Sequence, residues 1–198
     1  MANQTTATKA SARKRRADAD RSVAAILDAG LQALASDPDS SMSEIARRAG
    51  VVRATIYVHF PTRTDLLDAV MEYAVGQVVE AMRSAEPQCG EPVEALERVL
   101  RATWRQLGQF HGLLALNMAR LSAEELHRRH RPMLDQLEPL IERGQKKGVF
   151  RRDVPVVWHL AVLRAIVHAA STEIRGGRIS ESEAEPAMLT TAISAISP

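Results

Sequence analysis

Apolar residues recur at helical spacing along most of this chain. The first stripe follows a polar, basic segment, and its members lie three or four residues apart, which is typical of one buried helix face. The stripe comprises Val23, Ile26, Leu27, Leu31 and Leu34. We predict a helix that ends at Ser36, because a turn rich in Asp and Pro follows it. Residues 1–17 have no such period and are predicted to form a disordered arm.

Two short helices follow, and a tight turn joins them. Ser41 and Glu44 have the spacing of a capping box, in which each side chain bonds the backbone N–H of the other residue. They predict a helix over 42–49, and Gly50 marks its end because glycine tolerates a positive φ. A second helix is predicted over 53–60. Its inner face is predicted to comprise Val52, Ile56 and Phe60, which lie four residues apart.

The rest of the chain continues as helices. A second capping box, formed by Thr62 and Asp65, predicts the start of a helix that runs to about residue 84. Further helices are predicted at 92–108, 110–120, 122–130, 132–147, 155–175 and 182–196. No run alternates apolar and polar residues as a half-buried strand does. We therefore predict an all-α fold.

Composition narrows the setting in which this protein works. The single cysteine, Cys89, excludes a disulfide within the chain, which is typical of a reducing compartment. Charged residues interrupt the Ala- and Leu-rich stretch that follows Arg16, so we expect no secretory signal. No uncharged run reaches the length of about 20 residues that a membrane span needs. These observations predict a cytoplasmic protein with no membrane partner.

The charge is unevenly distributed along the chain. Residues 1–63 contain ten of the 26 Lys and Arg residues and six of the 24 Asp and Glu residues, which gives +4. The remaining residues contain sixteen and eighteen, which gives −2. A polyanionic partner is therefore expected at the N-terminal part.

Two short helices around a glycine turn are typical of a helix-turn-helix unit. The second helix enters the major groove of DNA, and the first helix supports it across the backbone. Such a unit needs an apolar inner face, small or polar outward residues and donors for phosphates. Residues 41–63 supply all three.

The motifs in this stretch resemble those of the TetR (tetracycline-repressor) family of bacterial transcription regulators. The resemblance rests on IARRAGV at 45–51, TIYVHF at 55–60, and Thr62, Arg63, Leu66 and Leu67. The turn at 148–153 also resembles one that is common in the family. The resemblance implies a three-helix DNA-binding domain at 18–62 and a helical effector-binding and dimerisation domain at 63–198.

The resemblance also implies which side chains touch DNA. They are Ser41, Ser43, Arg53, Ala54, Thr55, Tyr57, His59 and Arg63. Arg53 is placed to bond guanine, and the methyl group of Ala54 is placed to touch a thymine methyl. Arg63 stands at a helix N-terminus and is expected to pair with a phosphate. Val52 departs from the family pattern, because Ser or Thr is usual there and valine can neither cap the helix nor bond DNA.

The C-terminal helices are expected to join two subunits. Small residues on the helix at 155–175 permit close helix approach, and the last helix carries a second apolar stripe. These two helices from each of two subunits would form a four-helix bundle. The predicted interface comprises Ala161, Ala165, Ala169, Met188, Leu189, Ala192 and Ile193. The alternative is that both stripes pack within one subunit.

The resemblance implies an effector pocket among the helices between 92 and 147. Its predicted residues are Trp104, Phe110, His111, Asn117, Met118, Met133, Trp158 and His159. His127 and His130 lie three apart on a helix, but no acidic or cysteine cluster accompanies them at ligand spacing, so no metal site is predicted. No cofactor is expected either, because no phosphate-binding glycine loop or dehydrogenase motif occurs.

Together these features predict a ligand-responsive regulator that is not an enzyme. As a homodimer it would bind a palindromic operator as a repressor, and a small, mostly apolar effector would release it. One alternative is a helical small-molecule-binding protein or enzyme without DNA binding. Another is an activator of the same family, which the sequence does not separate from a repressor.

Overall fold

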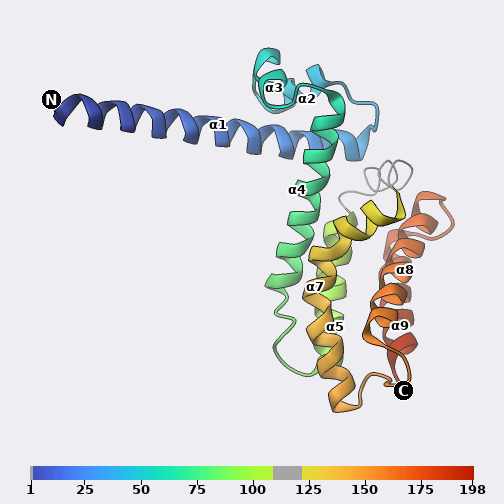
Figure 1. Ribbon diagram of the computed structural model, residues 1–198. Helices are drawn as coiled ribbons and strands as arrows, with labels where there is room; N and C mark the ends of the chain where they lie inside the picture. The colour runs from blue at the N-terminus through green and yellow to red at the C-terminus, as the bar shows by residue number, and fades with distance from the viewer. Residues whose placement is uncertain (1, 109–121) are drawn as a thin grey trace. The chain divides into compact units, whose positions relative to one another are not determined.

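Helices make up the regular structure of the described part of the chain. A computed structural model describes residues 2–108 and 122–198 (Figure 1). The all-α prediction is confirmed, since no strand occurs in these two stretches. The predicted helix at 110–120 lies outside the described residues. The chain divides into two compact units, Met1–Tyr73 and Ala74–Pro198.

The first unit contains three helices and the start of a fourth. They are α1 (Ala2–Ser36), α2 (Met42–Arg48), α3 (Arg53–His59) and α4 (Arg63–Ser84). Its fully buried side chains include Ile26, Leu34, Ile45, Ile56 and Leu66. Gly30 lets α1 approach α4 closely, because a Cβ atom there would lie 2.8 Å from a methyl carbon of Val70. The unit therefore extends into α4, to Tyr73, beyond the boundary predicted at residue 62.

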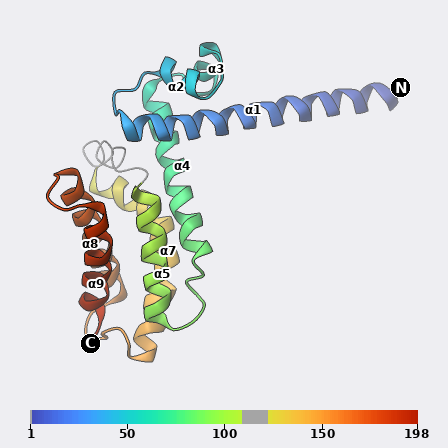
Figure 2. The same cartoon turned by 180° about the vertical axis from the view of Figure 1, so that it is seen from behind.

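The first helix begins much earlier than predicted. α1 starts at Ala2, whereas a disordered arm was predicted over 1–17 (Figures 1 and 2). That prediction relied on the absence of an apolar period. Such a period shows that a helix has a face to bury, but a helix can form without one. The segment is rich in Ala, Arg and Lys, whose intrinsic helix propensities are among the highest.

The second unit packs the end of α4 and four further described helices around one core (Figure 2). The four further helices are α5 (Pro92–Gly108), α7 (Ala123–Lys147), α8 (Val156–Arg175) and α9 (Glu181–Ile196). Its fully buried side chains include Leu96, Leu140, Ile141, Phe150 and Leu163. Arg101 links α5 to α9 by an ion pair of 2.8 Å with Glu185. None of the helices in the described stretches is long and apolar enough to cross a membrane.

One continuous helix, α7, stands where two helices were predicted. The expected break at Arg131 and Pro132 does not occur, and Pro132 lies inside α7. The apolar face continues past the proline: Met133 and Leu134 pack against the core, and Leu137 lies within it. Packing of a continuous apolar face thus outweighs the one backbone hydrogen bond that proline removes.

Candidate nucleic-acid interface

A side-chain cap and a glycine turn fix α2. The Ser41 hydroxyl accepts a hydrogen bond of 3.1 Å from the N–H of Glu44, as predicted. Gly50 has φ 68°, and Val51 N–H donates to the carbonyl of Ala46 at 3.0 Å, so the chain turns sharply towards α3. The Ser41 cap and the short turn at Gly50 together set the angle between α2 and α3.

The second half of the predicted capping box is absent. The Glu44 carboxylate does not return to Ser41. It instead accepts hydrogen bonds from Arg47 at 2.7 Å and Arg48 at 2.9 Å. The hydrogen bond from Arg47 is the main cause that lowers the pKa of Glu44 to about 2. Both arginines of α2 are therefore partly neutralised by an acid on their own helix.

The inner face of α3 is shorter than predicted. Ile56 is fully buried and Phe60 nearly so, but Val52 is 70% exposed. Val52 precedes the helix in an extended conformation (φ −72°, ψ 149°), so the four-residue helical spacing does not apply to it. It makes no side-chain cap, as the departure from the family pattern predicted.

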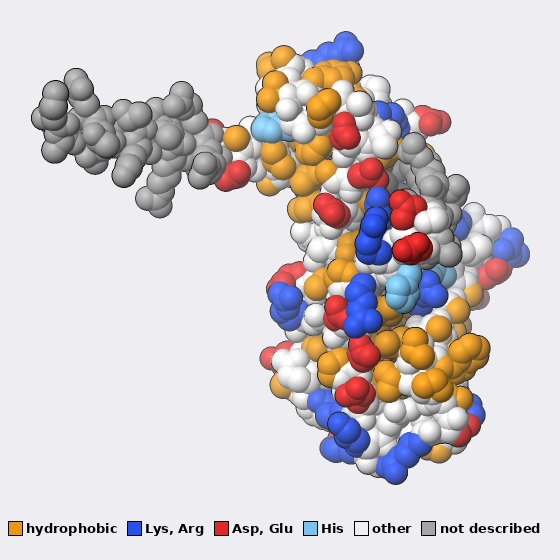
Figure 3. Space-filling view, viewed as in Figure 1, with side chains coloured by type: hydrophobic (Ala, Val, Ile, Leu, Met, Phe, Trp, Pro, Cys, Tyr) orange, Lys and Arg blue, Asp and Glu red, His pale blue; other side chains and the backbone are white. Residues whose placement is uncertain are grey.

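The outward surface of α3 combines a cation, an aromatic ring and small apolar groups. Arg53, Ala54 and Tyr57 are exposed, and Thr55 and His59 are half-buried. The Arg53 guanidinium lies 5.5 Å from the centre of the Tyr57 ring, one helical turn away, in a cation–π contact. α3 contains no acidic residue, so nothing on this helix opposes a polyanion. In Figure 3, hydrophobic and basic side chains lie side by side on the end of the unit that carries α2 and α3.

Arg63 is held more tightly than the sequence suggests. The predicted capping box of α4 forms: Thr62 N–H donates to the Asp65 carboxylate at 2.9 Å, and Asp65 N–H donates to the Thr62 hydroxyl at 3.1 Å. The Arg63 guanidinium donates to the backbone carbonyls of Ser40 and, at 2.7 Å, Pro38. These bonds join the start of α4 to the turn before α2. A positioning role thus accompanies the phosphate contact predicted for Arg63.

Sequence reasoning missed one residue on this surface. Val58 is 76% exposed and is absent from the predicted DNA contacts. It lies two residues after the buried Ile56, about 200° around the helix at 100° per residue. A helical projection of the sequence centred on Ile56 would have shown Val58 on the opposite, outward face.

The predicted effector residues are dispersed in the second unit. Trp104 is buried in the core and Met133 packs against it. His159 is also buried, with its Nδ1 atom 3.2 Å from the carbonyl of Pro155 and its Nε2 atom without a hydrogen-bond partner. Trp158 is 59% exposed, so it does not line the interior. Four other predicted residues lie outside the described part of the chain, namely Phe110, His111, Asn117 and Met118.

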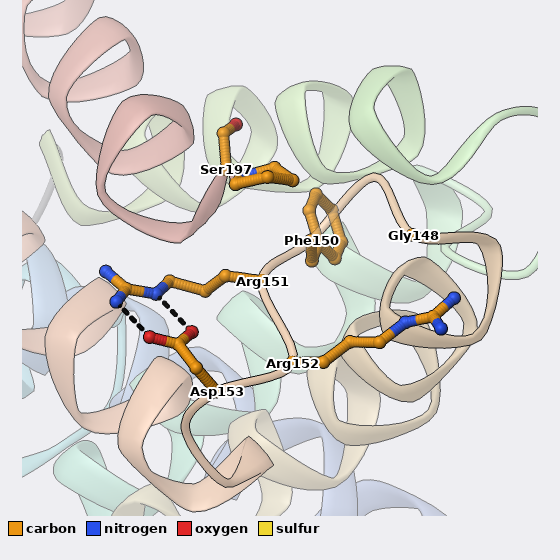
Figure 4. A pocket seen from close by; sticks show the side chains of 7 residues that line it. Gly148, Phe150, Arg151, Arg152, Asp153 and Ser197 are labelled. Atoms are coloured by element: carbon orange, nitrogen blue, oxygen red, sulfur yellow. Dashed lines mark hydrogen bonds and ion pairs between the residues drawn. The ribbon is translucent and has the colours of Figure 1, made fainter.

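A surface pocket lies elsewhere, between the α7–α8 turn and the C-terminus. Its volume is about 590 Å³, and no predicted effector residue lines it. Figure 4 shows Arg151 turned towards Asp153, with which it forms a bidentate ion pair. Arg152 is bound to the last carbonyls of α7, including that of Lys146 at 2.7 Å. The arginines of this pocket therefore stabilise the turn.

Only part of the predicted dimer interface is accessible. Met188, Leu189 and Ala192 are buried in the core of the single chain, so the prediction that they face a partner is wrong. Their stripe packs within the subunit because α9 lies against α5 and α8. The accessible members are Ala165 and Ala169, which are exposed, and Ala161 and Ile193, which are half-buried. Within the described residues, no group of three or more His, Cys, Asp or Glu side chains could hold a metal ion.

Known proteins match both units of the chain. A family model described as bacterial regulatory proteins of the tetR family matches residues 26–70. A second model, the C-terminal domain of tetracyclin-repressor-like proteins, matches residues 92–196. The HTH-type transcriptional repressor LfrR of Mycolicibacterium smegmatis is 37% identical over 83 residues. That match covers 42% of this chain and 44% of LfrR, so the chain spans less than half of this relative.

Solved structures extend the similarity to nearly the whole chain. A TetR transcription regulatory protein from Mycobacterium vanbaalenii is 30% identical, with a TM-score of 0.63, over 92% of this chain and 99% of its own. The structure of LfrR in complex with proflavine has a TM-score of 0.64 at 24% identity, over 90% of this chain and 98% of its own, which shows the shared fold. The helix-turn-helix with its capped α2 and glycine turn, and the helical second unit, agree with both matched models. This chain belongs to the TetR family of bacterial regulatory proteins.

Proposed function

We propose that this protein is a ligand-responsive transcriptional repressor that binds a palindromic operator as a homodimer. The outward surface of α3 carries the proposal. It places the guanidinium of Arg53 beside the Tyr57 ring on a helix without acidic residues. Such a surface suits a major groove, in which arginine bonds guanine and phosphates line both edges.

The other proposed DNA contacts surround α3. Ser41 and Ser43 stand at the start of α2, and both are exposed, so they can donate to phosphates. Arg63 fixes the start of α4 against the preceding turn and uses its remaining N–H groups for a phosphate. Thr55 and His59 flank the outer face of α3 and would approach the two backbones. This set joins one base-contacting helix to several backbone anchors.

The proposed dimer interface centres on α8. Trp158, Ala165 and Ala169 are exposed on this helix, and apolar side chains gather where α8 lies in Figure 3. An uncharged helix face of this kind is typical of an interface between subunits. Two-fold symmetry would then place two α3 helices about 34 Å apart, one turn of DNA.

The proposed effector is small and mostly apolar, and it binds the second unit. The unpaired Nε2 atom of buried His159 offers such a molecule one polar contact. The relative LfrR has been crystallised in complex with proflavine, a precedent for a small organic ligand. Binding would move α4 and change the separation of the two α3 helices, which lowers operator affinity.

Selection of bound duplexes from a random pool tests the proposal. We expect an inverted repeat with half-sites about one helical turn apart. The matched variant Arg53→Ala should weaken binding to the selected operator about tenfold or more, since a bidentate arginine–guanine pair contributes about 1–3 kcal/mol. If purified protein without effector enriches no duplex, the alternative of a helical ligand-binding protein without DNA binding is favoured.

The effector step needs a separate measurement. Gel-shift titrations of the selected operator would be repeated with compounds that bind the protein, beginning with planar aromatic ones. At least one ligand of the second unit should release the DNA. Operator affinity unchanged by every ligand that binds would contradict induction while leaving the DNA-binding proposal intact.

A further inference from the structure

The outermost part of α3 is apolar. Ile56 is fully buried. Ala54, two residues before it, and Val58, two residues after it, are both exposed. At 100° per residue both lie nearly opposite Ile56, and they are four residues apart, so they adjoin each other along the helix. Val58 is 76% exposed, more than any other exposed large apolar side chain in the described part of the chain.

The surroundings of this apolar face restrict what can cover it. Arg53 and Tyr57 border it on one side and Thr55 on the other, and α3 has no acidic side chain. A partner that presents apolar groups within a negative environment therefore suits this face. The major groove does so wherever thymine occurs, because the thymine C5-methyl group lies on the groove floor between two rows of phosphates.

We propose that Val58, next to the thymine contact already predicted for Ala54, meets the methyl group of a further thymine and is a specificity-determining residue of the operator complex. This inference rests on the proposed function. Four residues of α-helix advance about 6 Å, close to two base-pair steps of about 3.4 Å. The two side chains thus face methyl groups on nearby base pairs, and the half-site contains thymine at those positions.

Uracil substitution tests the inference without altering base pairing. After selection of the operator, each thymine of a half-site is replaced in turn by deoxyuridine, which lacks only the C5-methyl group. The substitution is made in both half-sites, and affinity is measured by fluorescence anisotropy at fixed salt. Loss of one buried methyl contact corresponds to about a fourfold loss of affinity per half-site.

The variant Val58→Ala completes the cycle. It should weaken binding to the operator that contains thymine. At one or two positions, replacing thymine by deoxyuridine should then cause no further loss of affinity (the uracil effect), while at the other positions the loss should remain. The matched control is Val52→Ala, since Val52 is also an exposed valine, at 70%, but lies before the helix. That control should keep the full uracil effect. Circular dichroism confirms that both variants fold.

Two results would overturn the inference. The first is specific operator binding that no uracil substitution weakens. The second is a uracil effect that Val58→Ala leaves unchanged at every position, which would assign the methyl contact to another side chain. In both cases the selected operator still supports the proposed function, whereas the absence of any selected operator would remove the proposed function and the inference together.

Discussion

Val52 occupies the N-cap of α3 without capping it. Its backbone already has the extended conformation that a capping serine adopts (φ −72°, ψ 149°), and its side chain is 70% exposed. A hydroxyl at this position could accept a hydrogen bond from the N–H groups that begin α3. Because so little of the valine is buried, its loss costs little packing. The residue thus leaves a stabilising interaction unused next to the outward surface of α3.

We predict that Val52→Ser raises the free energy of unfolding by about 0.5–1 kcal/mol. Thermal denaturation followed by circular dichroism measures the gain. Val52→Ala is the control, because it removes the same side chain without adding an acceptor, and it should give no gain. A serine variant no more stable than the alanine variant would show that the cap does not form.

At the scale of elements, local signals predicted the helix-turn-helix well. The cap of Ser41, the turn at Gly50 and the capping box at Thr62 depend on neighbours within a few residues, and all three occur in the structure. Two of the errors came from long-range packing. Neither the continuity of α7 through Pro132 nor the burial of the α9 stripe can be inferred without knowing which helices are adjacent. The bonds from Arg63 to carbonyls 23 and 25 residues away were hidden for the same reason.

Gly144 illustrates such a packing constraint within α7. A Cβ atom at this position would overlap the ring of Phe150, which is fully buried. We predict that Gly144→Ala lowers the free energy of unfolding by about 1–3 kcal/mol, because overpacking outweighs the helix propensity of alanine. Urea denaturation followed by tryptophan fluorescence reports on this unit, since Trp104 lies in its core.

Gly76 in α4 supplies the matched control. A Cβ atom there meets nothing within 4 Å, so Gly76→Ala should stabilise the protein by up to about 1 kcal/mol through helix propensity alone. The two identical substitutions should therefore have opposite signs. Equal effects at both positions would refute the close contact between Gly144 and Phe150.

A pair of histidines links α7 to α8. The rings of His130 and His168 lie 5.5 Å apart, and desolvation by burial is the main cause that lowers both pKa values, that of His168 to about 4. Positive charges at Arg164 and Arg175 lower the pKa of His168 further. Since these folded-state pKa values lie below the unfolded value of about 6.5, protonation favours the unfolded chain. Their stabilising contribution is complete above pH 6.5 and is lost as the pH falls towards 4.

We predict that His168→Gln makes stability less dependent on pH within this window. Urea midpoints measured from pH 7.5 to pH 4.5 should fall less steeply for the variant than for the native chain. Asp153, whose pKa is lowered to about 2, starts to lose its own stabilising contribution only near the low end of this range. It does so equally in both proteins, so the difference between the two profiles reports on His168. Parallel pH profiles for the two proteins would argue against a buried neutral pair.

At the scale of the whole molecule, the proposed function depends on two chains acting together. Ala165 is exposed on α8, in the middle of the proposed interface. Ala165→Arg keeps a good helix former but would place two large cations against each other across a two-fold axis. We predict that the variant sediments as a monomer at micromolar concentration, whereas the native chain sediments as a dimer. Operator affinity should fall by at least tenfold, because each monomer then holds only one half-site.

The control adds the same charge elsewhere in the second unit. Gln88→Arg lies in an exposed loop, so it should leave both the dimer and operator affinity intact. This comparison separates two effects of the added arginine. Loss of the interface weakens operator binding, whereas a general effect of added positive charge would strengthen it, since DNA is a polyanion. A dimeric Ala165→Arg variant with native operator affinity would place the interface away from the centre of α8. A monomeric variant with native affinity would show instead that one outward surface of α3 is sufficient for recognition.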